Sequence, residues 1–153
     1  MQDIEARLRE LGLRVTAPRR AVIAELREHS HVDVARLADG ARRRIGSVST
    51  QAIYDVVHTL TDAGILRSIE LPGSPEVFEL ARGDNHHHMV CRACGRITDV
   101  PCPAGLAPCL APSEDAGYLI DEAEVTYWGL CPGCRAKVAP RSQHHHATII
   151  NTH

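Results

Sequence analysis

The sequence predicts an α+β protein in which a helical N-terminal part is followed by a β-rich part that binds metal. Apolar residues recur at helical spacing from Ile4 to Leu60, and from Ile65 onward the spacing becomes that of short strands. Two Cys-x-x-Cys motifs follow, at Cys91–Cys94 and Cys131–Cys134. These three observations divide the chain into parts of different structure.

Four helices are predicted in the first part, each from an apolar face and from start or stop signals. The first ends near Gly12, the second begins at Thr16-Ala17-Pro18, and the fourth begins at Ser49 or Thr50 and ends at Gly64. The apolar faces consist of Ile4, Leu8 and Leu11; Val22, Ile23 and Leu26; Val34, Leu37, Ala38 and Ala41; and Ile53, Val56, Val57 and Leu60.

A hairpin is predicted directly after the fourth helix. Strand candidates at Ile65–Glu70 and Val77–Leu80 flank the segment Leu71-Pro72-Gly73-Ser74-Pro75, which is typical of a turn. Three or four helices followed by a hairpin make a winged helix-turn-helix.

The fourth helix carries polar side chains outside its apolar face. Gln51, Tyr54 or Asp55, and His58 are three to four residues apart and therefore share one exposed side. This side is either an ordinary solvated face or a surface for the major groove, where Gln reads adenine and Tyr contacts a thymine methyl or a phosphate. The net charge is −2, but residues 14–44 hold eight Arg against four acidic residues. This local basic patch favours DNA binding.

The second part of the chain carries metal-ligand patterns among strand candidates. The four thiolates of Cys91, Cys94, Cys131 and Cys134 are the ligand set of a closed tetrahedral zinc site. Nitrogen ligands in His86-His87-His88, so close to that site, indicate a second metal with a different role. Prolines between residues 101 and 112 disfavour a long helix there. The strand candidates are Met89–Cys91, Arg96–Val100 and Ala123–Leu130.

We expect a DNA-binding domain at residues 1–82, a metal-binding domain at 83–138, and a disordered tail at 139–153, which has no periodic pattern. Cysteines arranged mainly in two motifs indicate metal binding in a reducing cytoplasm rather than secreted disulfides. No apolar run approaches the roughly 18 residues of a membrane span, and no signal peptide opens the chain. The origin of His144-His145-His146 in the tail is left open.

Motifs along most of the chain resemble those of the ferric uptake regulator family, over about residues 1–136. They are Gly12-Leu13-Arg14-Val15-Thr16 with Pro18-Arg19, Ala52-Ile53-Tyr54, Asp62-Ala63-Gly64-Ile65, Phe78-Glu79-Leu80, His86-His87-His88 and both cysteine motifs. Within the family, Thr50–His58, Gly83–His88 and Tyr127–Cys131 resemble the actinobacterial FurA type, whose members typically accompany a catalase-peroxidase gene.

The resemblance implies a homodimer in which winged-helix domains bind double-stranded operator DNA and C-terminal α/β domains dimerise. Carried over residue by residue, it implies a regulatory site for Fe2+, Mn2+ or Zn2+ at His31, Glu79, His86, His88 and Asp99. Imidazoles and carboxylates without thiolate suit these three ions.

The same resemblance, together with the basic patch, suggests how DNA is contacted. Arg14 is expected in the narrow minor groove of an AT-rich site and Arg19 on phosphate, with Gln51 and Tyr54 in the major groove.

The residue at position 99 narrows the resemblance to one branch of the family. An Asp at this position resembles the peroxide-sensing branch, whereas iron-uptake regulators more often have Glu there. We therefore expect a peroxide-responsive repressor that binds AT-rich inverted repeats and controls a catalase-peroxidase gene and its own gene. The alternative is an iron- or zinc-homeostasis repressor of the same family. Cys102 and Cys109 either form a disulfide on oxidation or fill apolar space.

A non-haem iron enzyme with two His and a carboxylate is a remote alternative, since such enzymes need an enclosed substrate pocket. Three features depart from the family pattern. Asp55 follows Tyr54 where many members have Arg, which removes one phosphate contact. Ala123 replaces a histidine of a third metal site, so we expect that site to be absent or altered and His87 to face outward. Prolines interrupt the helix usually found between the cysteine motifs.

Overall fold

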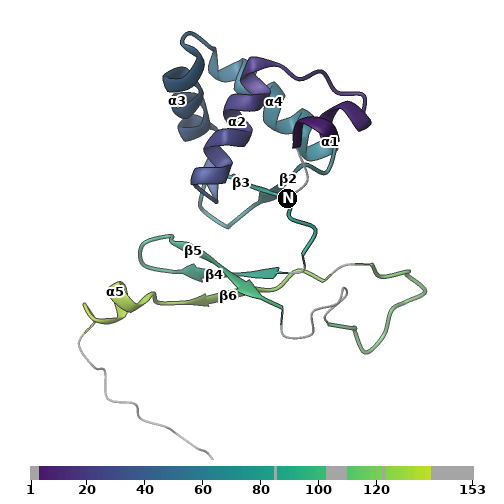
Figure 1. The fold of residues 1–153 in the computed structure, drawn as a ribbon. Helices are drawn as coiled ribbons and strands as arrows, with labels where there is room; N and C mark the ends of the chain where they lie inside the picture. The colour runs from purple at the N-terminus through teal and green to yellow at the C-terminus, as the bar shows by residue number, and fades with distance from the viewer. Residues whose placement is uncertain (1–3, 85, 103–109, 122, 139–153) are drawn as a thin grey trace, which may run out of the picture. The chain divides into compact units, whose positions relative to one another are not determined.

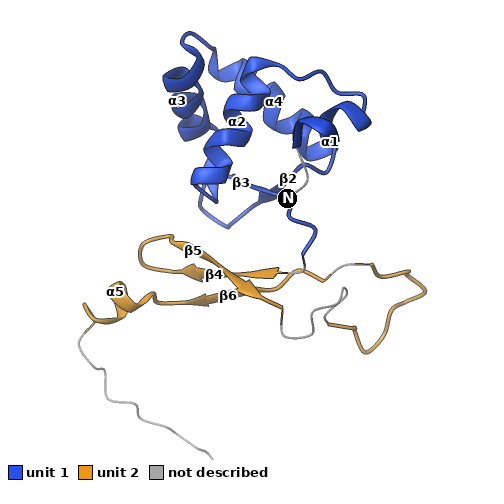
Figure 2. Ribbon diagram, in the orientation of Figure 1, with its two compact units in different colours: residues 1–84 blue, residues 85–153 orange. Residues whose placement is uncertain are grey.

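The computed structural model describes residues 4–84, 86–102, 110–121 and 123–138. The chain separates into two compact units, residues 1–84 and 85–153, which Figure 2 distinguishes by colour. Among the described residues, unit 1 contains four helices and a three-stranded sheet, and unit 2 contains a second three-stranded sheet and one short helix (Figure 1). Helices and mainly antiparallel strands that occupy separate stretches of the chain make this the α+β fold that the sequence predicts.

Unit 1 begins with helices whose starting points are set by local hydrogen bonds. Thr16 Oγ1 accepts a bond from the Arg19 amide, and Ser49 Oγ accepts one from the Ala52 amide, so both predicted helix starts are confirmed. Leu11 was expected on an apolar face but lies beyond α1 and is 40% exposed. The elements of unit 1 are α1 (Ile4–Glu10), α2 (Ala17–Glu28), β1 (Val32–Asp33), α3 (Val34–Ile45), α4 (Thr50–Asp62), β2 (Leu66–Ile69) and β3 (Val77–Leu80).

The sheet of unit 1 has the order β1-β3-β2, with both pairs antiparallel. The hairpin β2–β3 was predicted, whereas the two-residue strand β1 was not, because two residues are too short for any periodic signal. The core between helices and sheet includes Leu37, Ile53, Leu60 and Phe78, all at most 1% exposed. Three helices packed on a small hairpin sheet form a winged helix-turn-helix.

Helices α2 and α3 pack closely where Gly40 lies against Glu25. A Cβ atom at position 40 would lie 2.4 Å from the Glu25 carboxylate. This carboxylate is buried and binds the guanidinium groups of Arg43 and Arg44. The glycine therefore makes room for the buried Glu25 carboxylate, whose ion pairs with Arg43 and Arg44 tie the two helices together.

Unit 2 is built on strand β4 (His86–Cys91), which lies between β5 (Ile97–Pro101) and β6 (Thr126–Gly129). The β4–β5 pair is antiparallel and the β4–β6 pair is parallel. Strand β4 begins three residues before the predicted start and contains the whole histidine triplet. A short helix that was not predicted, α5 (Pro132–Arg135), lies inside the second cysteine motif.

Candidate metal centres and nucleic-acid interface

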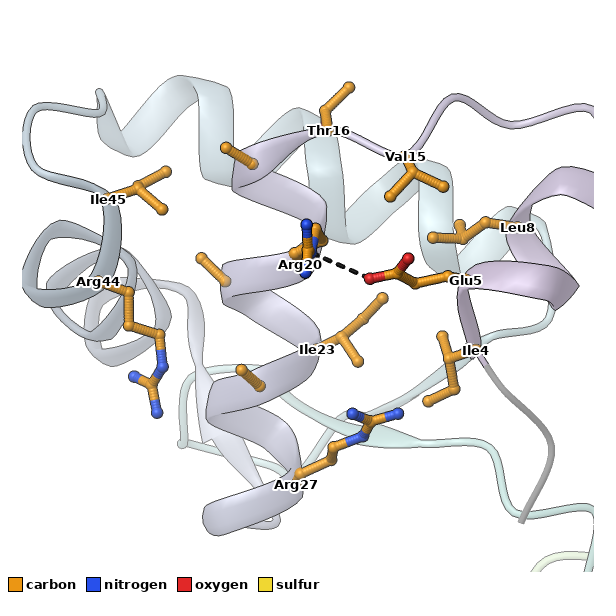
Figure 3. A pocket seen from close by; sticks show the side chains of 13 residues that line it. Ile4, Glu5, Leu8, Val15, Thr16, Arg20, Ile23, Arg27, Arg44 and Ile45 are labelled. Carbon is orange, nitrogen blue, oxygen red and sulfur yellow. Dashed lines mark ion pairs between the residues drawn. The ribbon is translucent and has the colours of Figure 1, made fainter.

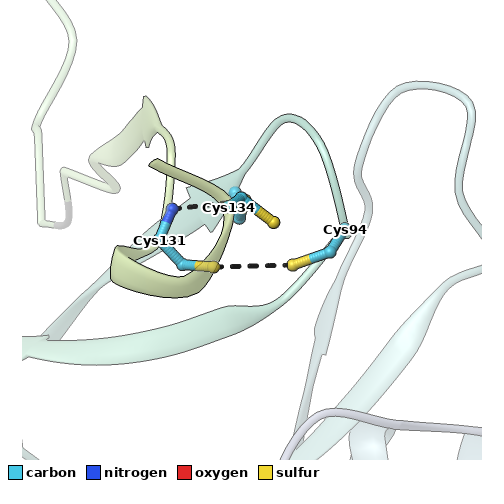
Figure 4. Close-up of side chains that lie close together, drawn as sticks. Cys94, Cys131 and Cys134 are labelled. Atoms are coloured by element: carbon cyan, nitrogen blue, oxygen red, sulfur yellow. Dashed lines mark hydrogen bonds between the residues drawn. The ribbon is translucent and has the colours of Figure 1, made fainter. Parts of the chain in front are cut away.

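The four cysteines of the two motifs lie together in unit 2. Cys91 ends β4, Cys131 caps α5, and the parallel β4–β6 pairing brings the two motifs side by side, with the Arg92 amide donating to the Gly129 carbonyl at 2.8 Å. All four sulfurs lie within 4.8 Å of one another. Figure 4 shows the sulfurs of Cys94, Cys131 and Cys134 turned toward a common point.

The spacing and electrostatics of this cluster fit a zinc ion. Cys94 Sγ and Cys131 Sγ are 3.8 Å apart, and two thiolates bound tetrahedrally at about 2.3 Å from zinc would be about 3.8 Å apart. The Cys131 amide donates to Cys91 Sγ at 3.3 Å, and this bond is the main reason that the pKa of Cys91 falls to about 6. The Cys134 amide lowers the pKa of Cys131 in the same way. Backbone donors thus stabilise the thiolate form that zinc requires.

The pKa of the Cys134 thiol shifts in the opposite direction. Hydrogen bonding with the side chain of Cys131 raises its pKa to about 12. Hydrogen bonding among the sulfurs therefore favours the protonated form of Cys134, and binding of a divalent cation would release that proton. A four-cysteine cluster of this kind fits a structural zinc.

Unit 1 contributes an imidazole and a carboxylate from two neighbouring strands. His31 Nε2 lies 3.3 Å from Glu79 Oε2, and both side chains are nearly buried. The strand register pairs Val32 with Phe78. Because β1 and β3 are antiparallel, His31, which precedes Val32, lies close to Glu79, which follows Phe78. His31 has a φ of 58°, a left-handed conformation that is uncommon for residues other than glycine. Such a backbone persists only when its surroundings hold it, and it is often found at functional sites.

Unit 2 contributes two imidazoles and a carboxylate from β4 and β5. His86 and His88 alternate along β4, and their ring centroids are 5.2 Å apart. Asp99 pairs with His88 across the sheet, and its Oδ1 lies 3.9 Å from His88 Nε2. The two histidines are buried and Asp99 is half-buried. Nitrogen and oxygen donors without thiolate have the chemistry that Fe(II), Mn(II) or Zn(II) prefers.

Two side chains near this group have positions that were not predicted from the sequence. His87 was expected to face outward, but it is 1% exposed, and its ring lies 6.5 Å from that of Tyr127. Glu124 was not singled out from the sequence, yet its Oε1 lies 3.9 Å from His88 Nδ1. Only the parallel pairing that sets His88 beside Thr126 brings Glu124 near, so no local sequence signal identifies it.

The exposed side of α4 carries the side chains that the sequence analysis assigned to DNA. Gln51 and Tyr54 are both exposed. Arg14 is exposed as well, and its carbonyl accepts a 2.6 Å bond from the Arg19 guanidinium. Cations near the start of α2 and a polar face on α4 are an arrangement suited to phosphate and base contacts.

The remaining candidates are less informative. Cys102 is buried, while Cys109 and the tail histidines lie outside the described residues.

A hollow of about 480 Å³ beside α2 is lined mainly by aliphatic side chains, and Arg20 there pairs with Glu5 at 3.0 Å (Figure 3). Its lining contains no histidine, so it lacks the two imidazoles that a non-haem iron site needs. Among the described helices, none combines the length and the apolar character needed to cross a membrane.

A winged helix with an exposed polar face, together with a four-cysteine cluster, is the architecture of a metal-dependent DNA-binding regulator. The model of the "Ferric uptake regulator family" matches residues 10–126. The transcriptional regulator FurA of Mycobacterium tuberculosis is 49% identical over 140 residues, which cover 92% of this chain and 95% of FurA. The ferric uptake regulation protein of Neisseria gonorrhoeae is 34% identical, covering 86% and 93%. The chain therefore belongs to the ferric uptake regulator family.

Solved structures show the same fold at low sequence identity. The ferric uptake regulator of Helicobacter pylori has a TM-score of 0.65 at 17% identity, covering 86% of this chain and 89% of that one. The Campylobacter jejuni peroxide stress regulator has a TM-score of 0.63 at 19% identity, covering 86% and 96%. The matched family and the FurA relative are transcriptional regulators, so this chain is a metal-responsive transcriptional regulator and not an enzyme.

Proposed function

We propose that this protein is a cytoplasmic, peroxide-responsive repressor that binds AT-rich inverted repeats as a homodimer. Its targets would be a catalase-peroxidase gene and its own gene. The extensive identity with FurA supports this assignment. The observation that carries the peroxide response is the carboxylate paired with His88, which is an aspartate, Asp99, rather than a glutamate.

In this proposal His31 and Glu79 of unit 1 bind the same ion as His86, His88 and Asp99 of unit 2. The support is chemical, because each unit offers only part of a ligand set for an ion that commonly takes five or six ligands. Sharing the ion would hold the DNA-binding unit in one orientation, and loss of any ligand would release it. Domains would lie at residues 1–82 and 83–138.

The four cysteines would have a separate, structural role. Zinc bound by Cys91, Cys94, Cys131 and Cys134 would stabilise unit 2 whatever the state of the regulatory site, because closed thiolate sites contribute directly to folding.

Histidine oxidation is the proposed sensing reaction. Fe(II), if held by this ligand set, would supply the one-electron cleavage of peroxide next to the imidazoles. The imidazole of His31 or His86 would gain one oxygen atom from peroxide, which would be reduced and leave its other oxygen as water. The oxidised imidazole would be a poor donor, so the two ligand sets would separate and the repressor would leave its operator. The competing route is a disulfide between Cys102 and Cys109. Burial of Cys102 disfavours that route, because a thiol needs exposure to react quickly.

Mass spectrometry after brief peroxide treatment of the Fe(II)-loaded protein tests the sensing reaction. We expect an added oxygen on His31 or His86, and unmodified histidines in the manganese-loaded control. A Cys102–Cys109 disulfide with intact histidines, together with loss of sensing when both cysteines are replaced by serine, would refute it. Intact histidines, intact cysteines and undiminished operator binding would instead favour the iron- or zinc-homeostasis alternative.

DNA binding is tested by metal-dependent retardation of AT-rich duplexes. Tyr54→Ala should relax sequence preference by roughly 1–3 kcal/mol per altered base contact. Arg19→Ala should weaken binding to every sequence and reduce the salt dependence, because its expected contact is a phosphate. Equal losses on specific and random DNA for Tyr54→Ala would show that Tyr54 contacts no base.

A further inference from the structure

Helix α4 contains a side-chain hydrogen bond that determines which donor and acceptor groups its exposed face offers to a ligand. Gln51 Nε2 donates to Asp55 Oδ1 at 2.9 Å, one helical turn further along. Both side chains are exposed, on the side of α4 away from buried Ile53 and Val57. A carboxylate only accepts hydrogen bonds, so the amide nitrogen of Gln51, rather than its oxygen, must face Asp55.

This bond favours one orientation of the remaining hydrogen-bonding groups of Gln51. A bond made by the N–H on the side away from Oε1 leaves the second N–H and Oε1 side by side at the free edge of the amide. A neighbouring donor and acceptor are the pattern that pairs with N7 and the amino group of adenine. A free glutamine would instead rotate among several orientations before it met a base.

We propose that Asp55 is a specificity-determining residue, which positions Gln51 to read adenine in the major groove. This inference rests on the proposed function, since it requires α4 to enter DNA. Asp55 has a second effect, because its negative charge is on the side that would face phosphates. Among the described residues no Arg, Lys or His pairs with Asp55, so the charge is not neutralised within unit 1. Asp55 therefore lowers affinity for all DNA while it sharpens the choice of base.

Two substitutions separate these effects. Asp55→Asn removes the charge but keeps an oxygen that accepts from Gln51, whereas Asp55→Ala removes both. Position 55 is exposed on a helix, where asparagine and alanine are both tolerated, so neither variant should unfold unit 1. Both should bind random DNA more tightly and to a similar extent. Only Asp55→Ala should lose discrimination at the base contacted by Gln51.

The experiment selects duplexes from a randomised library with the full-length protein loaded with zinc and manganese. The base position read by Gln51 is identified as the one whose preference disappears in Gln51→Ala. At that position we expect Asp55→Ala to reduce the preference for adenine about three- to tenfold, from the loss of one side-chain pair and of side-chain order. Asp55→Asn should reduce it less than about twofold.

The double variant provides the decisive comparison. If Asp55 acts through Gln51, Asp55→Ala should change no base preference in the Gln51→Ala background. Equal loss in Asp55→Asn and Asp55→Ala, or a further loss in that background, would overturn the inference. A wild-type protein that selects no sequence at all would overturn the proposed function as well, which distinguishes the two failures.

Discussion

Replacing Gly40 with alanine tests the packing that holds the DNA-binding unit together. The new Cβ atom would lie 2.4 Å from Cδ and Oε2 of Glu25 and 2.9 Å from its Cγ. Carbon atoms pack best about 3.5–4.0 Å apart, so the carboxylate must move by about 1 Å. It has little freedom to do so, because Glu25 is 4% exposed and binds both Arg43 and Arg44.

Three contributions determine the size of the effect. Displacing the carboxylate weakens a charge-assisted hydrogen bond that contributes about 1.5–3 kcal/mol. Forcing a methyl group into a filled site costs about 1–3 kcal/mol. Alanine favours the helix over glycine by about 1 kcal/mol, which offsets part of the loss. Because the first two contributions overlap, we expect the free energy of unfolding of unit 1 to fall by about 2–4 kcal/mol.

Urea unfolding followed by far-ultraviolet circular dichroism measures this change. Helices α1 to α4 contain nearly all helical residues described, so the signal reports unit 1, whereas fluorescence of the single Trp128 reports unit 2. In a Glu25→Ala background the obstructing carboxylate is gone, and Gly40→Ala should be neutral or stabilising by up to about 1 kcal/mol. An equal cost in both backgrounds, or a cost below about 0.5 kcal/mol in the wild type, would refute the reasoning.

Three further substitutions test the metal centres and the helix-turn-helix. Cys94→Ser should release zinc and unfold or monomerise unit 2, as measured by zinc content and size-exclusion chromatography, while the control Cys102→Ser should keep its zinc and its dimeric state. A folded, dimeric Cys94→Ser protein would contradict the zinc assignment. Arg42 donates hydrogen bonds to the Val48 carbonyl, Asp39 and Thr50, so Arg42→Ala should lower the free energy of unfolding by about 1 kcal/mol. It should also weaken DNA binding more than Arg36→Ala, which removes the same charge without those bonds. Equal effects of the two substitutions would show that only the charge matters. Glu124→Gln should weaken manganese binding about tenfold in a calorimetric titration, and the control Asp121→Asn should not. An unchanged manganese affinity in Glu124→Gln would exclude a role for Glu124 beside His88.

Local signals in the sequence were sufficient for most elements of unit 1. Thr16 and Ser49 start helices because their side chains bond to amides three residues further on, an interaction that depends on neighbouring residues alone. The cysteine motifs were equally clear, since two ligands two residues apart form a recognisable pattern within one turn. The resemblance to the ferric uptake regulator family, which the comparisons confirm, followed from motifs in chain order.

Other features depended on contacts between distant residues. Strand β1, with its two residues, exists only because β3 pairs with it, and that pairing brings His31 to Glu79. The burial of His87 and the approach of Glu124 to His88 follow from the placement of β6 beside β4.

The sequence by itself determined the fold class, the zinc-ligand pattern and the family, because each depends on periodicity or on spacing along the chain. Tertiary structure decided which side chains meet. Strand register set the pairing of His88 with Asp99, and helix packing made Gly40 necessary beside Glu25. A shift of one residue in register would turn every side chain of β4 to the opposite face, and no local pattern in this sequence determines that register.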